Sequence, residues 1–450
     1  MRLGSIPADL SRFLDFIRLP LYQYRFGYVA GHSHISDEQV ASIKDILRNA
    51  GQSEKENIVG SYEKKFAALV GPGRGLSFAA ARMGFYILMD ELGIGKGDEI
   101  ILPAFTCGVM ANAILRREAT PVFTNISEAT FGSDPAEIEK KITDRTKMVV
   151  AQHTFGIPCD IAPIASTCRE KGIFLLEDSA IALDSSVGNK KVGRWGDAAI
   201  FSTEHNKPLN TIIGGFFYSE NRDLLEKIRV RSNGIPDLEP IHQENLFRRF
   251  LFERKYYTPA RYGKGLFLGS IQQRYNSLFA KGRMAVFLDR DYCRPGKNKG
   301  HGYPYPARMP AALAKLGIYE LERWDTVKER RKGILKKYLA ASEDLPVRAF
   351  LPAGYFDKSY DIIPLRFLFA HPEADRINHA MKGYVHINTR LYTEPISCDD
   401  NKLDELGYHA GSCTVSEKAC SRIINWPCTV PPEMEETIVT IFRDTFSATP

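Results

Sequence analysis

At 450 residues, with 44% hydrophobic and 25% charged side chains, the chain has the composition of a globular protein and the length for a large and a smaller domain. It contains no apolar run of the roughly 20 residues that span a membrane. Arg12, Asp15 and Arg18 interrupt the N-terminal apolar stretch, so it does not predict a secretory signal. The eight cysteines include no Cys-x-x-Cys pair, which favours free thiols in a reducing compartment and argues against a metal site or a disulfide framework. We therefore expect a cytoplasmic protein without a metal.

The first 50 residues predict a helical segment. Leu10, Phe13, Leu14 and Ile17 recur at the spacing of one helix face. We expect this helix to pack on the body of the protein, with a membrane-surface element as the alternative.

Between residues 51 and 240, short apolar runs alternate with charged helical stretches at 134–141 and 161–171. The runs that predict strands are Ile100–Leu102, Pro121–Phe123, Met148–Ala151 and Ile173–Leu176. Strands as apolar as these are buried on both faces, and the helices between them serve as crossovers, so the sheet should be mostly parallel. Ligands bind such sheets at the carboxyl ends of the strands.

An aspartate and a lysine come at the ends of two successive apolar runs. Asp178 ends the run that begins at Phe174, and Lys207 lies just beyond the next run, with Gly214 and Gly215 after it. Pyridoxal phosphate (PLP) requires such a pair, because a lysine amine forms a Schiff base with its aldehyde while a carboxylate keeps its pyridine nitrogen protonated. The two residues would then share one cleft. The alternatives are a surface lysine and an aspartate that caps the next helix.

Several further motifs surround these two residues. They are Glu177–Ala180, Val192–Asp197 and Ser202 ahead of Lys207, with more distant pieces at 92–103, 155–158, 310–323 and 415–427. In this order and spacing they resemble the DegT/DnrJ/EryC1/StrS family of PLP-dependent aminotransferases, which aminate keto groups on nucleotide-linked sugars. The resemblance implies the α/β architecture of fold type I. A large PLP-binding domain at 51–240 would carry a mostly parallel seven-stranded sheet, and a smaller α+β domain would occupy 306–450.

The resemblance also implies a role for each site residue. Lys207 would hold the cofactor and shuttle a proton, Asp178 would face the pyridine nitrogen, and the hydroxyl of Ser202 would contact the phosphate. Ser202 could instead be a buried serine bonded to the backbone. The helix that opens at Ala81 and Arg82, where the family has Gly-Thr, would bind the phosphate through its backbone N–H groups. The Arg82 side chain would add a charged contact or point away.

Two positions depart from the family pattern. Cys107 stands where an aromatic residue often covers the ring, and Ile181 stands where His or Gln contacts the cofactor hydroxyl. Some relatives replace the lysine by histidine and act as dehydratases, but counting from Ser202 gives that place to Lys207 and not to His205. Glu177 should point to the other side of its strand, so we expect no chemistry from it.

The stretch from 241 to 305 predicts a basic, aromatic insertion. Residues 241–300 contain thirteen Lys and Arg against four acids, a net charge of +9, whereas the whole chain carries +6. Three interpretations remain: a helical flap or dimer contact, a funnel for the diphosphate of a nucleotide-linked substrate, or a peripheral membrane patch. No nucleic-acid-binding motif accompanies the charge, so we expect no nucleic-acid partner.

These observations together predict an aminotransferase. It would move an amino group from an amino acid, with glutamate the expected donor, to a keto-sugar on a nucleotide, for cell-surface glycans or secondary-metabolite sugars. Family members are usually homodimers whose active sites lie at the interface, and the resemblance implies the same here. The alternatives are a sugar dehydratase that works from pyridoxamine phosphate and a catalytically inactive, PLP-binding regulatory protein.

Overall fold

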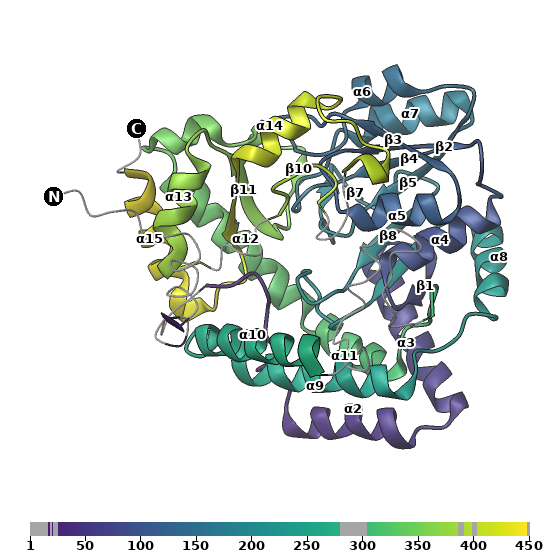
Figure 1. Ribbon diagram of the computed structural model, residues 1–450, viewed down its shortest axis with the longest axis horizontal. Coiled ribbons are helices and arrows are strands. Elements are labelled where there is room, and N and C mark those ends of the chain that lie inside the picture. The colour runs from purple at the N-terminus through teal and green to yellow at the C-terminus, as the bar shows by residue number, and fades with distance from the viewer. Residues whose placement is uncertain are drawn as a thin grey trace.

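A seven-stranded sheet forms the centre of the fold (Figure 1). The computed structural model describes residues 17, 18, 20, 26–279, 304–385, 391–397 and 403–447. In the order β1-β9-β8-β5-β4-β2-β3, six strands point one way and β9 opposes them. The sheet is therefore mostly parallel, as predicted. The strands are β1 (Arg74–Phe78), β2 (Glu99–Pro103), β3 (Thr120–Thr124), β4 (Thr146–Gln152), β5 (Phe174–Asp178), β8 (Ala198–Ser202) and β9 (Gly215–Ser219).

The crossover helices begin and end at residues that favour helix termini. Asp134 accepts hydrogen bonds from the N–H groups of Ala136 and Glu137 and so caps α6, while Gly172 ends α7 in the left-handed conformation. The predicted helices at 134–141 and 161–171 are thereby confirmed. The helices around the sheet are α4 (Ala81–Glu91), α5 (Gly108–Arg116), α6 (Pro135–Lys141), α7 (Ile161–Lys171) and α8 (Arg222–Ser232).

Three helices from two distant parts of the chain complete the core of this sheet. They are α2 (Asp37–Asn49), α3 (Gln52–Val70) and α11 (Ala311–Glu322). Helix α11 packs along α3 so closely that a Cβ on Gly317 would lie 2.4 Å from the ring of Tyr62. Residues 311–322 therefore join the core of the large sheet although they follow the insertion. The predicted helix around Leu10, Phe13 and Leu14 lies outside the described residues.

A second core lies towards the C-terminus and combines a two-stranded antiparallel sheet with helices. Its elements are α12 (Trp324–Ala341), β11 (Arg366–Ala370), α13 (Ala374–Ala380), α14 (Thr414–Arg422), β12 (Ile423–Pro427) and α15 (Glu435–Ser447), with 3₁₀ helices at Pro346–Phe350, Ala353–Phe356, Met381–Gly383 and Pro432–Met434. A further 3₁₀ helix, Leu403–Leu406, packs on the first core. Aromatic rings fill it, among them Tyr338, Phe367, Trp426 and Phe442. The short strands β6 (Ser186–Val187), β7 (Lys190–Lys191) and β10 (Tyr360–Asp361) pair to join the two parts.

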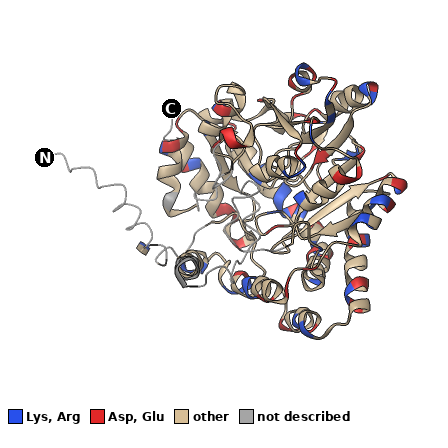
Figure 2. Ribbon diagram, turned by 45° about the vertical axis from the view of Figure 1, so that its right-hand side comes forward, with Lys and Arg blue, Asp and Glu red and all other residues tan. Residues whose placement is uncertain are grey.

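The insertion forms two helices in its described part, α9 (Pro240–Tyr256) and α10 (Tyr262–Phe279), whereas residues 280–303 lie outside the described residues. Helix α9 packs on α10 and on α2 (Figure 1). Figure 2 shows that basic and acidic residues alternate along the outer helices. Among the helices that the structure describes, none combines the length and the apolar character needed to cross a membrane.

Candidate active site

Polar residues end three adjacent strands at the carboxyl edge of the sheet. Gln152 ends β4, Asp178 ends β5 in register with it, and Ser202 ends β8. Lys207 follows in a turn in which its backbone N–H donates to the Glu204 carbonyl at 2.8 Å. The six residues predicted to form the site, Ala81, Arg82, Cys107, Asp178, Ser202 and Lys207, all line one cavity at this edge.

Asp178 is the buried acid of the cavity. Its side chain is 6% exposed, and one carboxylate oxygen accepts the Ala180 N–H at 3.0 Å. Burial raises the pKa of Asp178, and the Ala180 N–H and the positive charge of Lys207 oppose that rise only in part. A cationic group bound against this carboxylate would stabilise its charged form.

Glu177, next in sequence, serves the loop behind the strand. Its two oxygens accept hydrogen bonds from the N–H groups of Gly193 and Gly196, both at 2.7 Å, and from that of Trp195. It also contacts His153 Nε2 at 3.0 Å, while His153 Nδ1 accepts the Cys159 N–H. The ring therefore bridges a carboxylate and the backbone. Neither Glu177 nor His153 is among the residues that line the cavity.

The N-terminus of α4 faces the same cavity. The preceding residue, Ala80, makes no side-chain hydrogen bond to the first turn of the helix, where the backbone N–H groups of Ala81 and Arg82 lie. The strand β9 begins directly beside them, because a Cβ on Gly215 would lie 1.9 Å from the Ala81 nitrogen. Only glycine allows this approach. The half-buried hydroxyl of Ser202 lines the cavity nearby and accepts the Glu204 N–H at 3.4 Å.

An aromatic ring that sequence analysis missed also lines the cavity. Tyr392 packs edge-on against Phe105, with ring centroids 5.3 Å apart. Its segment is anchored beside Cys107, where the Ser397 N–H donates to Thr106 at 2.9 Å. No local pattern around 391–397 signals this role. By contrast, Gln152 could have been found, because it ends an apolar strand as Asp178 does.

Cys107 and Ile181 also line this cavity. Burial raises the pKa of Cys107 to about 11, so its thiol is protonated near neutral pH. His205 is not among the residues that line the cavity; its Nδ1 lies 3.6 Å from Glu253 Oε1, on the far side of the loop.

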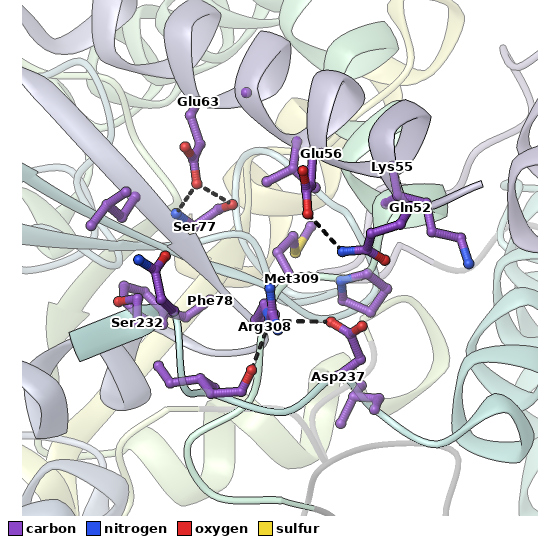
Figure 3. A pocket seen from close by; sticks show the side chains of 18 of the residues that line it. Gln52, Lys55, Glu56, Glu63, Ser77, Phe78, Ser232, Asp237, Arg308 and Met309 are labelled. Carbon is purple, nitrogen blue, oxygen red and sulfur yellow. Dashed lines mark hydrogen bonds and ion pairs between the residues drawn. The ribbon is translucent and has the colours of Figure 1, made fainter. Parts of the chain in front are cut away.

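A larger cavity, of about 400 Å³, lies along the outer edge of β1 and contains none of the predicted site residues (Figure 3). There Glu63 accepts hydrogen bonds from the Ser77 N–H at 2.7 Å and from the Ser77 hydroxyl at 2.9 Å. Arg308 donates to the Ile235 carbonyl and lies 3.5 Å from Asp237. These polar groups already have partners, so size alone does not make this cavity the reaction site.

The groups around the smaller cavity fit PLP. An amine, a buried carboxylate and a helix N-terminus with a hydroxyl beside it are the partners that an aldehyde, a pyridine nitrogen and a phosphate require. In the described part of the chain, no cluster of His, Cys, Asp and Glu is arranged to hold a metal ion.

Comparison with known proteins supports this fit. The sequence model of the DegT/DnrJ/EryC1/StrS aminotransferase family matches residues 33–245 and 284–442. The spore coat polysaccharide biosynthesis protein SpsC of Bacillus subtilis is 29% identical over 312 residues, which are 69% of this chain and 68% of that protein. The GDP-perosamine synthase of Vibrio cholerae is 30% identical over 194 residues, 43% of this chain and 53% of that protein.

The fold has close counterparts among solved structures. The PLP form of Spr1654 from Streptococcus pneumoniae superposes with a TM-score of 0.65 at 17% identity, covering 94% of this chain and 98% of that one. The sheet, the cavity at its carboxyl edge and the family match thus agree, and the chain belongs to the DegT/DnrJ/EryC1/StrS aminotransferase family, with pyridoxal phosphate as its cofactor.

Proposed function

We propose that this aminotransferase moves an amino group from an amino acid, with glutamate the expected donor, to the keto group of a nucleotide-linked sugar. The observation that carries the proposal is the convergence of Lys207, Asp178 and the N-terminus of α4 on one cavity. The names of the two relatives, a polysaccharide biosynthesis protein and a GDP-perosamine synthase, support a role in making aminated sugars for a surface polysaccharide.

Each side chain has a distinct task in this proposal. Bound PLP supplies the aldehyde that carries the amino group and a ring that takes up electron density. Lys207 Nζ removes a proton from Cα of the amino donor and later returns one to the sugar carbon. The Asp178 carboxylate holds a proton on the ring nitrogen, because its buried charge is stabilised by a cation beside it.

In this proposal, the residues at the other end of the cavity bind and orient the phosphate of the cofactor. The N–H groups at Ala81 and Arg82 and the hydroxyl of Ser202 hold the phosphate. Tyr392 and Ile181 are apolar walls that exclude water from the proton transfers. We also propose that the protein acts as a homodimer, as is usual in its family.

The position of the basic residues favours amino transfer over dehydration. Lys207 lines the cavity, whereas His205 lies behind it near Glu253. A histidine-dependent dehydratase would need an imidazole where the amine stands.

The test is to incubate the purified protein with glutamate and nucleotide-linked 3-keto and 4-keto sugars and to follow products by mass spectrometry. We expect an aminated sugar and 2-oxoglutarate. Borohydride reduction should attach the cofactor covalently to Lys207, and Lys207→Ala should abolish the attachment and lower transfer by several orders of magnitude. A deoxy-sugar product would identify a dehydratase, and bound cofactor without any transfer would identify a regulatory protein. Attachment at another lysine would contradict the site.

A further inference from the structure

One buried carboxylate of the insertion contacts the loop that carries Lys207. The family model leaves residues 246–283 unmatched, and this gap contains most of α9 and all of α10. Glu253, on α9, is fully buried although it is charged. A buried charge is retained only when partners satisfy it, so its contacts show what the insertion holds.

Both oxygens of Glu253 are engaged. Oε2 accepts a hydrogen bond from Asn210 Nδ2 at 3.1 Å, and Oε1 accepts one from Arg249 Nε at 2.8 Å. Oε1 also lies 3.6 Å from His205 Nδ1. Asn210 and His205 are on either side of Lys207, so this single carboxylate touches the loop before and after the lysine.

Asn210 also forms a hydrogen bond with a strained turn. Its Oδ1 accepts the Ile212 N–H at 2.8 Å, and Ile212 has φ +69°, a left-handed conformation that β-branched residues rarely adopt. The Ile212 carbonyl in turn accepts the His205 N–H at 3.0 Å. The loop that carries Lys207 is thus closed at its base by a strained residue, and surrounding contacts must hold such a residue in place.

We propose that Glu253 is a positioning residue: from a helix outside the family pattern, it holds the loop that presents Lys207 to the cavity. The insertion would then support catalysis and would not be a surface flap alone. This inference rests on the proposed function, because it takes Lys207 as the cofactor lysine.

The test must separate positioning from folding. Glu253→Gln keeps the shape but leaves the Arg249 guanidinium buried without its counter-ion, which destabilises a fold. The double variant Arg249→Met, Glu253→Gln removes both charges together and avoids that penalty. Glu99→Gln is the matched control, because Glu99 is also a buried carboxylate paired with an arginine, Arg145, but lies at the opposite edge of the sheet.

Two measurements decide the question. Hydrogen exchange of the cofactor-free protein reports whether residues 203–215 are held, and steady-state kinetics report whether the lysine is well placed. In both Glu253 variants we expect the amides of this loop to exchange at least about tenfold faster, while those of β4 and β5 keep their protection. We expect kcat to fall by about tenfold to 100-fold, with KM for the amino donor changed much less. Glu99→Gln should show neither effect.

Wild-type exchange in residues 203–215 of the folded double variant, with kcat within about twofold of wild type, would overturn the inference. If neither variant folds, Glu253 serves the fold as a whole and the positioning role is also rejected. The exchange measurement needs no cofactor or substrate. It therefore still decides the role of Glu253 if borohydride labelling shows that Lys207 does not carry the cofactor, which would reject the proposed function instead.

Discussion

A single side chain, Asp178, shows how position at a strand end prepares a group for chemistry. The last residue of β5 points out of the sheet at its carboxyl edge, where the cavity lies, yet it remains buried. Burial raises the pKa of this carboxyl, so the charged form costs free energy until a cation binds beside it. The same free energy then favours a protonated ring nitrogen.

Replacing Asp178 by Asn should separate catalysis from folding. The amide keeps the shape but cannot balance a positive ring nitrogen, so we expect kcat to fall by about 100-fold or more while cofactor is still bound. Near-normal turnover would contradict the assignment. Glu177 could not then be the substitute, because its oxygens are occupied by the loop at 193–196.

The cofactor-free protein gives the control for this variant. A carboxyl with a raised pKa binds its proton more tightly in the folded state, so its contribution to stability is lost as pH rises above the ordinary value of about 3.9. The variant Asp178→Asn has no carboxyl group at this position, so it does not lose this stability as the pH rises. We therefore expect the Tm of the variant, relative to wild type, to increase as the pH rises above that ordinary value. A Tm difference between variant and wild type that does not change with pH would contradict a raised pKa of Asp178.

Residues at strand ends could be predicted from sequence, and residues brought in from afar could not. Asp178 ends an apolar run, so its place at the carboxyl edge follows from the parallel sheet, whereas the role of Ser202 was implied by the family resemblance. Tyr392 comes from a segment without a pattern, and Glu253 lies in a basic helix where an acid between arginines suggests a solvated face. Their roles depend on packing between distant segments, which no local signal records.

At the scale of elements, the contact between β9 and α4 depends on one glycine. Gly215→Ala would place a Cβ 1.9 Å from the Ala81 nitrogen and force the strand and the helix apart. We expect a loss of about 1–3 kcal/mol in the free energy of unfolding, with weaker cofactor binding because the N–H groups of α4 shift. Gly60→Ala on α3 is the control, since nothing lies within 4 Å of its added Cβ. Denaturant unfolding and cofactor titration check both; equal behaviour of the two variants would contradict the close approach.

The basic helix α9 is partly neutralised by its own neighbours. Arg254 donates to the Ile35 carbonyl and pairs with Asp37 at 2.7 Å, and Arg249 pairs with Glu253. These side chains support packing, so they are unsuitable for testing a charged surface. The exposed basic residues of the described insertion include Arg248, Lys255 and Lys264.

Changing Arg248, Lys255 and Lys264 to Gln tests the three interpretations of the insertion. We expect a flap or dimer contact, and therefore a KM for the nucleotide-linked sugar within about twofold of wild type at low salt, where charge effects are largest. Binding to anionic vesicles should not change either. A rise in KM that shrinks with added salt would indicate a substrate funnel, and lost vesicle binding would indicate a membrane patch.

For the whole molecule, the alternation of apolar runs and helices predicted the mostly parallel sheet correctly, because each strand is buried on both faces. The surface on which α11 packs could not be predicted from such a pattern. Its apolar face packs on α3, more than 240 residues away in sequence, and joins the first core. A helical period shows that a face is buried but not which surface covers it.

The wall formed by Tyr392 has a consequence for how such a protein can change over evolution. The cavity is built from strand ends of the large sheet, yet one side is closed by a residue that follows β11 and packs within the C-terminal core. The C-terminal part is therefore not an independent module that can be exchanged between relatives without touching the cofactor site. Consider a chimaera that joins the first 370 residues of this chain to the C-terminal part of a relative. The residue in the place of Tyr392 then comes from the relative. The reaction specificity of the chimaera would change together with its C-terminal part.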